Sequence, residues 1–235
     1  MDTIKAIDSA IQDVIDDFHK APGKYFTEED VRWRLTQKIE AALLPAADIK
    51  VSDGMTSLVH TEFPTPFKCL MGERSFKVTD EGKRGHFDIV ILNSEIAKRC
   101  ELDLLRSQDY SEFNLAIRNN KMRPFFLDCA IELKLFRTAK GSKWTKSAGE
   151  TDAQYALQTV SKLDATLKNT GDAKQFAKRG IVLLFDNRIW AKDEDSKPGR
   201  DQFLKRMKST DWKSHPSLSC IWVTIKNTLK SPSFN

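Results

Sequence analysis

Three short apolar runs rich in branched and aromatic residues predict buried β-strands. They are FDIVIL from Phe87, FFLDCAIELKLF from Phe125 and GIVLLF from Gly180. Runs of this length and composition are typical of strands inside a sheet. Between the last two runs, residues 152–169 carry apolar side chains at helical spacing. Strands that alternate with a helix in this way predict an α/β sandwich with a mixed central sheet.

The N-terminal part of the chain predicts two helices. Apolar residues fall on one face of a helix over about 3–19, a segment that lacks the apolar core of a secretory signal. Thr27 is the expected N-cap of a second helix, which runs to about Leu44 and is ended by Pro45. Further strands are expected at 49–52, 57–63, 75–78 and 220–225, with a helix near 200–209 and a charged helical insertion at about 95–120. We expect residues 1–235 to form one domain.

Composition excludes several classes of protein. No stretch approaches the roughly 18 consecutive apolar residues of a membrane span. The four cysteines are far apart and form no CxxC pair, and the four histidines show no metal-site spacing, so neither a zinc site nor a disulfide framework is predicted. We therefore expect a cytoplasmic protein with reduced thiols. The formal net charge of +5 does not by itself require a nucleic-acid partner.

Charged residues interrupt two of the apolar runs. Asp88 lies in FDIVIL, and both Glu132 and Lys134 lie in CAIELKLF. The two-residue period of a strand places Glu132 and Lys134 on the same face. Burying a carboxylate costs several kcal/mol unless it is paired or binds a metal. Two interpretations follow: a structural ion pair with Asp88 capping a turn, or a functional site.

The order of these residues resembles the PD-(D/E)XK nuclease superfamily. The matching segments are His86–Leu92 for the first acid and Ala130–Lys134 for the ExK motif. The element order of roughly residues 25–190 agrees with the resemblance, although no proline precedes Asp88 and the Asp88–Glu132 separation is long. The resemblance implies a restriction-endonuclease-like fold, in which a mixed central sheet is flanked by helices in three layers.

The resemblance also implies a metal site and its chemistry. Asp88 and Glu132 would hold Mg²⁺, with Mn²⁺ as a substitute and the Leu133 carbonyl as a third ligand. Lys134 would orient the attacking water or stabilise the transition state as a point charge.

Helical residues of related nucleases often complete this site. On the first core helix both Glu28 and Glu29 are available, and helical geometry favours Glu28 because it lies on the side of the apolar stripe. Glu62 is a further candidate. On the helix after the ExK motif Gln158 is the preferred polar residue, with a solvated helix face as the alternative.

A basic segment follows the ExK strand. Arg137, Lys140, Lys143 and Lys146 occur there without an acid and with one indole, Trp144. A solvated connecting loop explains this segment about as well as contacts with phosphates does. In the second case Trp144 would stack on an unpaired base.

The function expected from these residues is metal-dependent endonuclease cleavage of nucleic acid, with DNA favoured and the choice between DNA and RNA left open. The alternative is a catalytically silent relative that binds nucleic acid or a protein. Other α/β enzymes are disfavoured because the chain lacks a glycine-rich phosphate loop and a GxSxG motif. Nucleic acid is the expected partner, no membrane association is expected, and a homodimer is left open.

Overall fold

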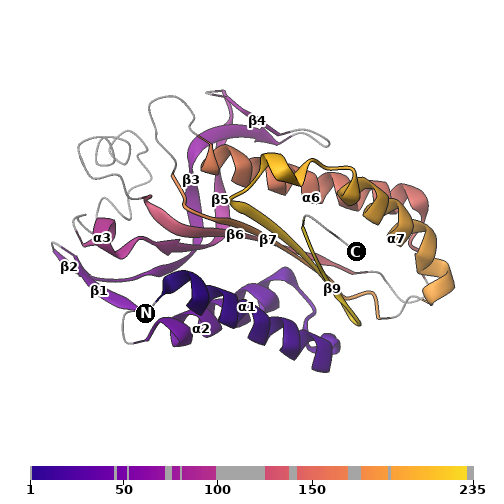
Figure 1. Cartoon of the computed structure of the whole chain (residues 1–235), viewed down its shortest axis with the longest axis horizontal. Helices are drawn as coiled ribbons and strands as arrows, with labels where there is room; N and C mark the ends of the chain where they lie inside the picture. The colour runs from indigo at the N-terminus through magenta and orange to yellow at the C-terminus, as the bar shows by residue number, and fades with distance from the viewer. Residues whose placement is uncertain are drawn as a thin grey trace.

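The computed structural model arranges the chain in three layers, with a central sheet between two pairs of helices (Figure 1). Helices α1 (Thr3–Lys20) and α2 (Glu28–Leu43) cover one face, and α6 (Lys146–Leu167) and α7 (Asp193–Lys208) cover the other. The structure describes residues 2–44, 47–51, 53–71, 76–79, 81–98, 125–137, 142–168, 176–189 and 192–231.

The central sheet is mixed, as the sequence predicts. Its order is β4-β3-β5-β6-β7-β8-β9. Strands β6, β7 and β8 are parallel to one another, and the other neighbouring pairs are antiparallel. The strands are β3 (Val59–Met71), β4 (Phe76–Val78), β5 (Lys83–Leu92), β6 (Leu127–Phe136), β7 (Gly180–Asp186), β8 (Leu218–Thr224) and β9 (Thr228–Lys230).

The first helical layer follows from amphipathic sequence and good capping. Asp2 caps α1 by accepting a hydrogen bond from the Ile4 amide. Thr27 and Asp30 form a capping box at the start of α2, which confirms the predicted N-cap. Apolar residues of both helices pack on one face of the sheet with Ile89, Ile131 and other strand residues of that face. The short 3₁₀ helix Pro22–Lys24 joins α1 to α2.

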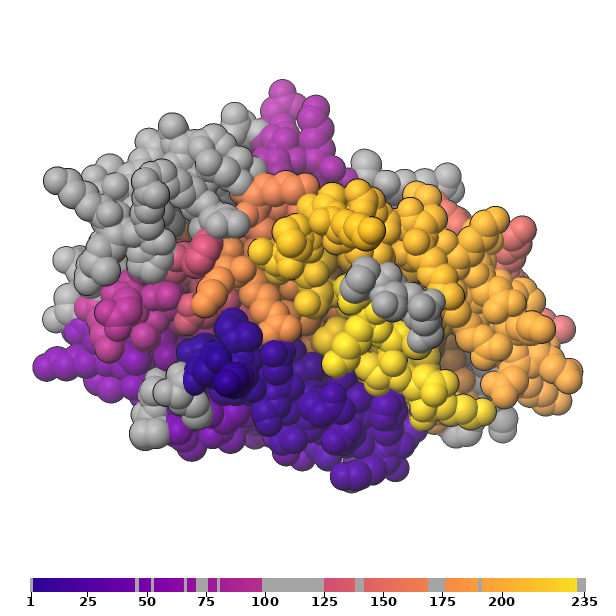
Figure 2. Space-filling view, in the orientation of Figure 1, coloured from indigo at the N-terminus to yellow at the C-terminus, as the bar shows by residue number. Residues whose placement is uncertain are grey.

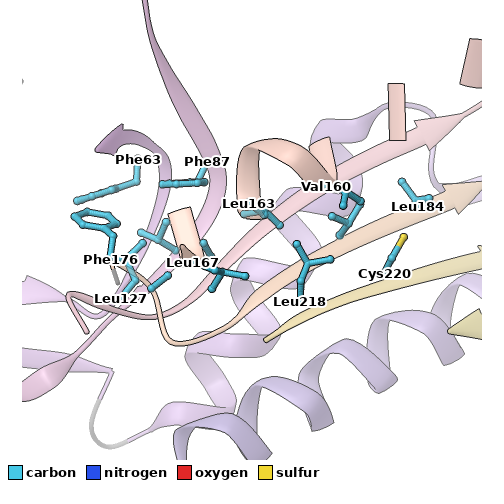
Figure 3. Close-up of a cluster of buried hydrophobic side chains, with 14 of the residues drawn as sticks. Phe63, Phe87, Leu127, Val160, Leu163, Leu167, Phe176, Leu184, Leu218 and Cys220 are labelled. Carbon is cyan, nitrogen blue, oxygen red and sulfur yellow. The ribbon is translucent and has the colours of Figure 1, made fainter. Parts of the chain in front are cut away.

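The second helical layer encloses a separate apolar core on the opposite face of the sheet. Val160, Leu163 and Leu167 of α6 point toward strand residues such as Leu184 and Leu218 (Figure 3). These helical residues repeat every three or four positions, so one face of α6 is buried along much of its length. Helix α7 packs over α6 and contributes Phe203 and Met207.

Some elements differ from the sequence prediction. The strand expected at 49–52 is β1 (Asp48–Val51), which pairs with β2 (Gly54–Ser57) in a separate two-stranded sheet. Helix α6 begins at Lys146, earlier than predicted, because Thr145 caps it and Gly149 packs against α7. Helix α7 also begins earlier, and β9 was not predicted. Of the expected insertion only α3 (Ser94–Ala97) and Lys98 are described, and the rest of 95–120 lies outside the described residues.

Helix α1 and the C-terminal strands lie side by side on one side of the molecule. Figure 2 shows α1 next to the C-terminal strands. Asp8 of α1 and Lys230 of β9 line a pocket there with Arg179, whose guanidinium lies 2.7 Å from the Asp8 carboxylate. The 3₁₀ helix Trp212–Ser214 precedes β8. This pocket shares no residue with the predicted nuclease site.

Candidate functional site at the fork between β5 and β6

Strands β5 and β6 separate at the predicted acidic residues. Their antiparallel pairing runs from Leu92 and Leu127 to Ile89 and Ile131, and then stops. The next positions along each strand are Asp88 and Glu132. We call this point the fork. The prediction that the strands carrying the two acids are neighbours is confirmed.

The open edge of β6 beyond the fork is capped by two carboxylates. The Leu133 amide donates to Asp88 Oδ2 at 2.7 Å, and the Leu135 amide donates to Glu28 Oε2 at 3.3 Å. Alternate amides of a strand point to the same side, so both donors face the edge that β5 has left. Asp88 and Glu28 thus replace the missing strand partner and are held at fixed places along β6.

Glu28 also receives the lysine of the ExK motif. The Lys134 ammonium lies 3.1 Å from Glu28 Oε1. The first turn of α2 lies beside the C-terminal end of β6 in space. Its first residue, Glu28, therefore reaches both the β6 backbone and the Lys134 side chain. Glu29 instead pairs with Arg32. Of the two candidates, Glu28 is the one that contacts the lysine of the ExK motif, and its part in a metal site stays a prediction.

Glu132 has a partner that the sequence analysis missed. It is only 3% exposed, and its Oε1 lies 2.6 Å from the ammonium of Lys162 on α6. Lys162 Nζ also donates to the His86 carbonyl at 2.8 Å. Burial raises the pKa of Glu132 to about 7; the Lys162 charge opposes this rise and nearby Asp88 adds to it. The sequence suggested Lys134 as the ion-pair partner of Glu132, and the structure corrects this to Lys162.

Arg32 connects the remaining acids to the fork. Its guanidinium contacts Glu29 and Glu62, and its Nη1 lies 3.7 Å from Asp88 Oδ1. Glu62 adopts a φ of 52°, which is uncommon for a residue other than glycine and marks a constrained backbone. Sequence reasoning found Glu62 but missed Arg32, whose position three residues after Glu29 fits an ordinary helix-surface pair.

The charges at the fork are unbalanced. Five carboxylates face three cations, so two negative charges are left if every group is ionised. The groups are Glu28, Glu29, Glu62, Asp88 and Glu132 against Arg32, Lys134 and Lys162. Within the described ranges, no three acidic, histidine or cysteine side chains are close enough to form a ready-made metal centre.

Gln158 lies one turn before Lys162 on α6. It is buried, with 6% of its surface exposed. This burial contradicts the alternative of a solvated helix face, and residues four apart share one face of a helix, so Gln158 lies on the same side of α6 as Lys162.

The basic segment after β6 is divided between core and surface. Arg137 Nη1 donates to the Phe26 carbonyl at 2.6 Å, and Lys143 lies 3.3 Å from Asp195 while its side chain stays 71% exposed. Lys146 is exposed at the first position of α6. Lys140 lies outside the described residues.

The prediction that Trp144 stacks on a base is wrong for this structure. Trp144 is only 3% exposed, and the centre of its ring lies 3.3 Å from the guanidinium carbon of Arg188. It also packs against Phe203 and Trp222. A tryptophan in a basic segment resembles a platform for base stacking, but here the ring packs in the apolar core and against the buried arginine.

Arg188 belongs to a second buried polar cluster that was not predicted. Its guanidinium lies 3.0 Å from both Asp186 and Asp152. Burial raises the pKa of Asp186 to about 6, and the Arg188 charge opposes this rise. The cluster ties the end of β7 to α6, and we assign it a structural role.

Among the helices that the structure describes, none is both long and apolar enough to cross a membrane. Comparison of the chain with protein-family models, curated proteins and solved structures found no significant match.

Proposed function

We propose that this chain is a metal-dependent nuclease that hydrolyses phosphodiester bonds in nucleic acid, with DNA as the preferred substrate. One observation carries the proposal: Asp88 and Glu132 occupy adjacent strands at the point where those strands separate, and Asp88 already contacts the Leu133 amide. A buried carboxylate at the end of a strand ladder is costly, which favours a functional role over an accidental one.

The element order supports a restriction-endonuclease-like fold for the proposed enzyme. The first core helix is α2, followed by the antiparallel strands β3, β5 and β6, the crossover helix α6 and the parallel strand β7. In this assignment the first acid lies on the second core strand and ExK lies on the third.

The donor set at the fork fits a hard divalent cation. Asp88 and Glu132 supply carboxylate oxygens, and the excess negative charge at the fork favours a cation. The N–H and C=O of one residue point to the same side of a strand, so the Leu133 carbonyl is expected at the open edge beside its amide. Mg²⁺ or Mn²⁺ accepts such oxygens and keeps several waters, so three protein donors are sufficient.

When bound, the cation would neutralise phosphate charge and lower the pKa of a coordinated water. Lys134 would orient the attacking water or stabilise negative charge on the phosphate. Glu28, which holds the Lys134 ammonium at 3.1 Å, would position that lysine. Arg137, Lys143 and Lys146 remain proposed contacts for backbone phosphates.

Cleavage assays test the proposal. Plasmid DNA, single-stranded DNA and RNA should be incubated with Mg²⁺, Mn²⁺ or EDTA. We expect cleavage only with metal, and a loss of at least about 100-fold in Asp88→Asn, Glu132→Gln and Lys134→Met. Asp16→Asn, an exposed carboxylate whose described contact is with Gln12 on the same helix, is the matched control and should cleave normally. Metal-independent cleavage, or full activity in Asp88→Asn, would reject the proposal.

A catalytically silent nucleic-acid-binding protein is the second candidate. Glu132 and Glu28 each hold a lysine and Asp88 lies near Arg32, an arrangement that can be stable without any metal. Binding of nucleic acid that is the same in EDTA and in Ca²⁺, together with no cleavage in Mg²⁺ or Mn²⁺, would favour this candidate.

A further inference from the structure

Lys162 joins α6 to both strands of the fork. Its ammonium lies 2.6 Å from Glu132 Oε1 on β6 and 2.8 Å from the His86 carbonyl on β5. The ammonium also lies 5.8 Å from the ring centre of Phe87. Only 8% of the residue is exposed. The side chain therefore fills the space between helix and sheet directly behind the proposed metal ligand.

A buried ammonium needs a specific reason. Replacing a buried ion pair by apolar side chains of similar volume is often neutral or stabilising. The neighbouring residues Val160 and Leu163 show that this layer is otherwise an apolar core. The lysine of the ExK motif is not the partner of Glu132, because Lys134 pairs with Glu28. The two lysines thus have separate carboxylates.

We propose that Lys162 is a positioning residue that holds Glu132 at the fork before a divalent cation binds, and that the cation then shares Glu132 with this ammonium. The inference rests on the proposed function, because it assigns Glu132 to a cation. The contact engages Oε1, and the carboxylate has a second oxygen with its own lone pairs. The His86 carbonyl keeps the ammonium in place.

This arrangement has a cost for cation affinity. A fixed positive charge within a few ångströms of the cation repels it, and the repulsion is strong where water is excluded. Lys162 therefore gives a preorganised carboxylate at the expense of weaker cation binding. A lysine that only attached α6 to the sheet would have no such effect.

Calcium binding to the intact protein tests the inference without any cleavage step. Calorimetry and the Ca²⁺-induced rise in melting temperature should be compared for wild type and Lys162→Met. In titrations at a pH well above 7, chosen so that Glu132 is ionised in the variant as well as in wild type, we expect Lys162→Met to bind Ca²⁺ about tenfold more tightly or better, since a like charge is removed, and to show a larger Ca²⁺-induced rise. Lys162→Arg keeps the charge and should bind close to wild type. Lys38→Met, which removes an ion-paired lysine on α2 3.2 Å from Asp13, is the control.

Unchanged or weaker Ca²⁺ binding in Lys162→Met would overturn the inference. Should that variant fail to fold, Lys162→Gln serves instead, because its amide can donate a hydrogen bond without carrying a charge, and the same tightening is expected.

Failure of the inference is distinguishable from failure of the proposed function. A wild type that binds Ca²⁺ through Glu132, as shown by loss of binding in Glu132→Gln, but cleaves no nucleic acid would reject the nuclease and keep the role of Lys162. A wild type that cleaves, with a Lys162→Met variant that binds Ca²⁺ like wild type, would reject only the role of Lys162.

Discussion

The two acids at the fork differ in how deeply they are buried. The side chain of Asp88 keeps 16% of its surface exposed, whereas Glu132 is enclosed with the Lys162 ammonium. Glu132 is therefore the more important of the two for stability, because its removal leaves a charged lysine inside the protein.

Glu132→Ala should therefore destabilise the metal-free protein by about 3–5 kcal/mol, the usual cost of breaking a buried pair. Asp88→Ala should cost about 1 kcal/mol, in line with one lost hydrogen bond to the Leu133 amide. Urea unfolding in EDTA measures both. The double variant Glu132→Ala/Lys162→Met should recover part of the loss, because no unpaired charge remains. Equal stability of Glu132→Ala and wild type would contradict this account.

Single residues of the candidate site were predictable where the local geometry of a strand or a helix determines their place. Asp88, Glu132 and Glu28 stood out because each is an acid whose position follows from local periodicity. Lys162 did not, because a lysine next to Leu163 on a helix ordinarily points to solvent. Its burial depends on Glu132, thirty residues earlier in the chain, and a local pattern carries no record of that contact. The burial of Trp144 was not predicted for the same reason, since its partner Arg188 lies far along the chain.

At the scale of elements, the contact between α6 and α7 determines where α6 begins. A Cβ added to Gly149 would lie 2.1 Å from the Gly199 carbonyl oxygen, so the two helices touch through their backbones. The Gly199 amide also donates to the Trp144 carbonyl at 2.8 Å. The serine- and glycine-containing segment before Thr151 thus resembles a loop in sequence but is helical because α7 packs on it.

The sign of the stability change in Gly149→Ala tests this contact between α6 and α7. In an open helix the change would stabilise by up to about 1 kcal/mol. Here we expect a loss of about 2 kcal/mol or more, because the methyl group meets backbone that cannot move aside. Thermal unfolding measures the change. Gly23→Ala is the matched control, since the nearest atom to its new Cβ is 4.0 Å away. Increased stability of Gly149→Ala would show that the helices are less closely packed.

The strands were the most predictable elements. Apolar runs located β5, β6 and β7 because both faces of these strands are buried, which leaves a continuous signal. Strand β1 was also located, to within one residue, but its pairing with β2 in a separate small sheet was not predicted. The order of the sheet was not predictable, since pairing between β3 and β5 or β7 and β8 depends on contacts distant in sequence.

At the scale of the whole molecule, the three layers bring distant segments to one fork. Helix α2 contributes Glu28 from one side of the sheet and α6 contributes Lys162 from the other. Strands β5 and β6 contribute Asp88 and Glu132 between them. The same burial that assembles the site also places carboxyl groups where their charged form is unfavourable.

This burial predicts an unusual dependence of stability on pH for the metal-free protein. The pKa of Glu132 is raised from 4.5 to about 7, and that of Asp186 from 3.8 to about 6, in both cases because burial disfavours the charge. A group whose pKa is higher in the folded state contributes stability below its unfolded pKa and loses that contribution as the pH rises through its folded pKa. Unfolding free energy should therefore fall between about pH 4.5 and pH 7, with Glu132 accounting for roughly 3 kcal/mol.

Urea unfolding in EDTA at pH 5 and pH 8 measures the fall. Glu132→Gln cannot ionise, so its loss of stability between the two pH values should be smaller than that of wild type by up to about 3 kcal/mol. The exposed Glu95→Gln serves as control and should follow wild type. Asp17 and Asp30 do not interfere, because their pKa values are lowered by hydrogen bonds and their contribution is lost only at more acidic pH. An equal pH 5 to pH 8 difference in wild type and Glu132→Gln would show that Glu132 stays ionised across this range, held by Lys162 alone.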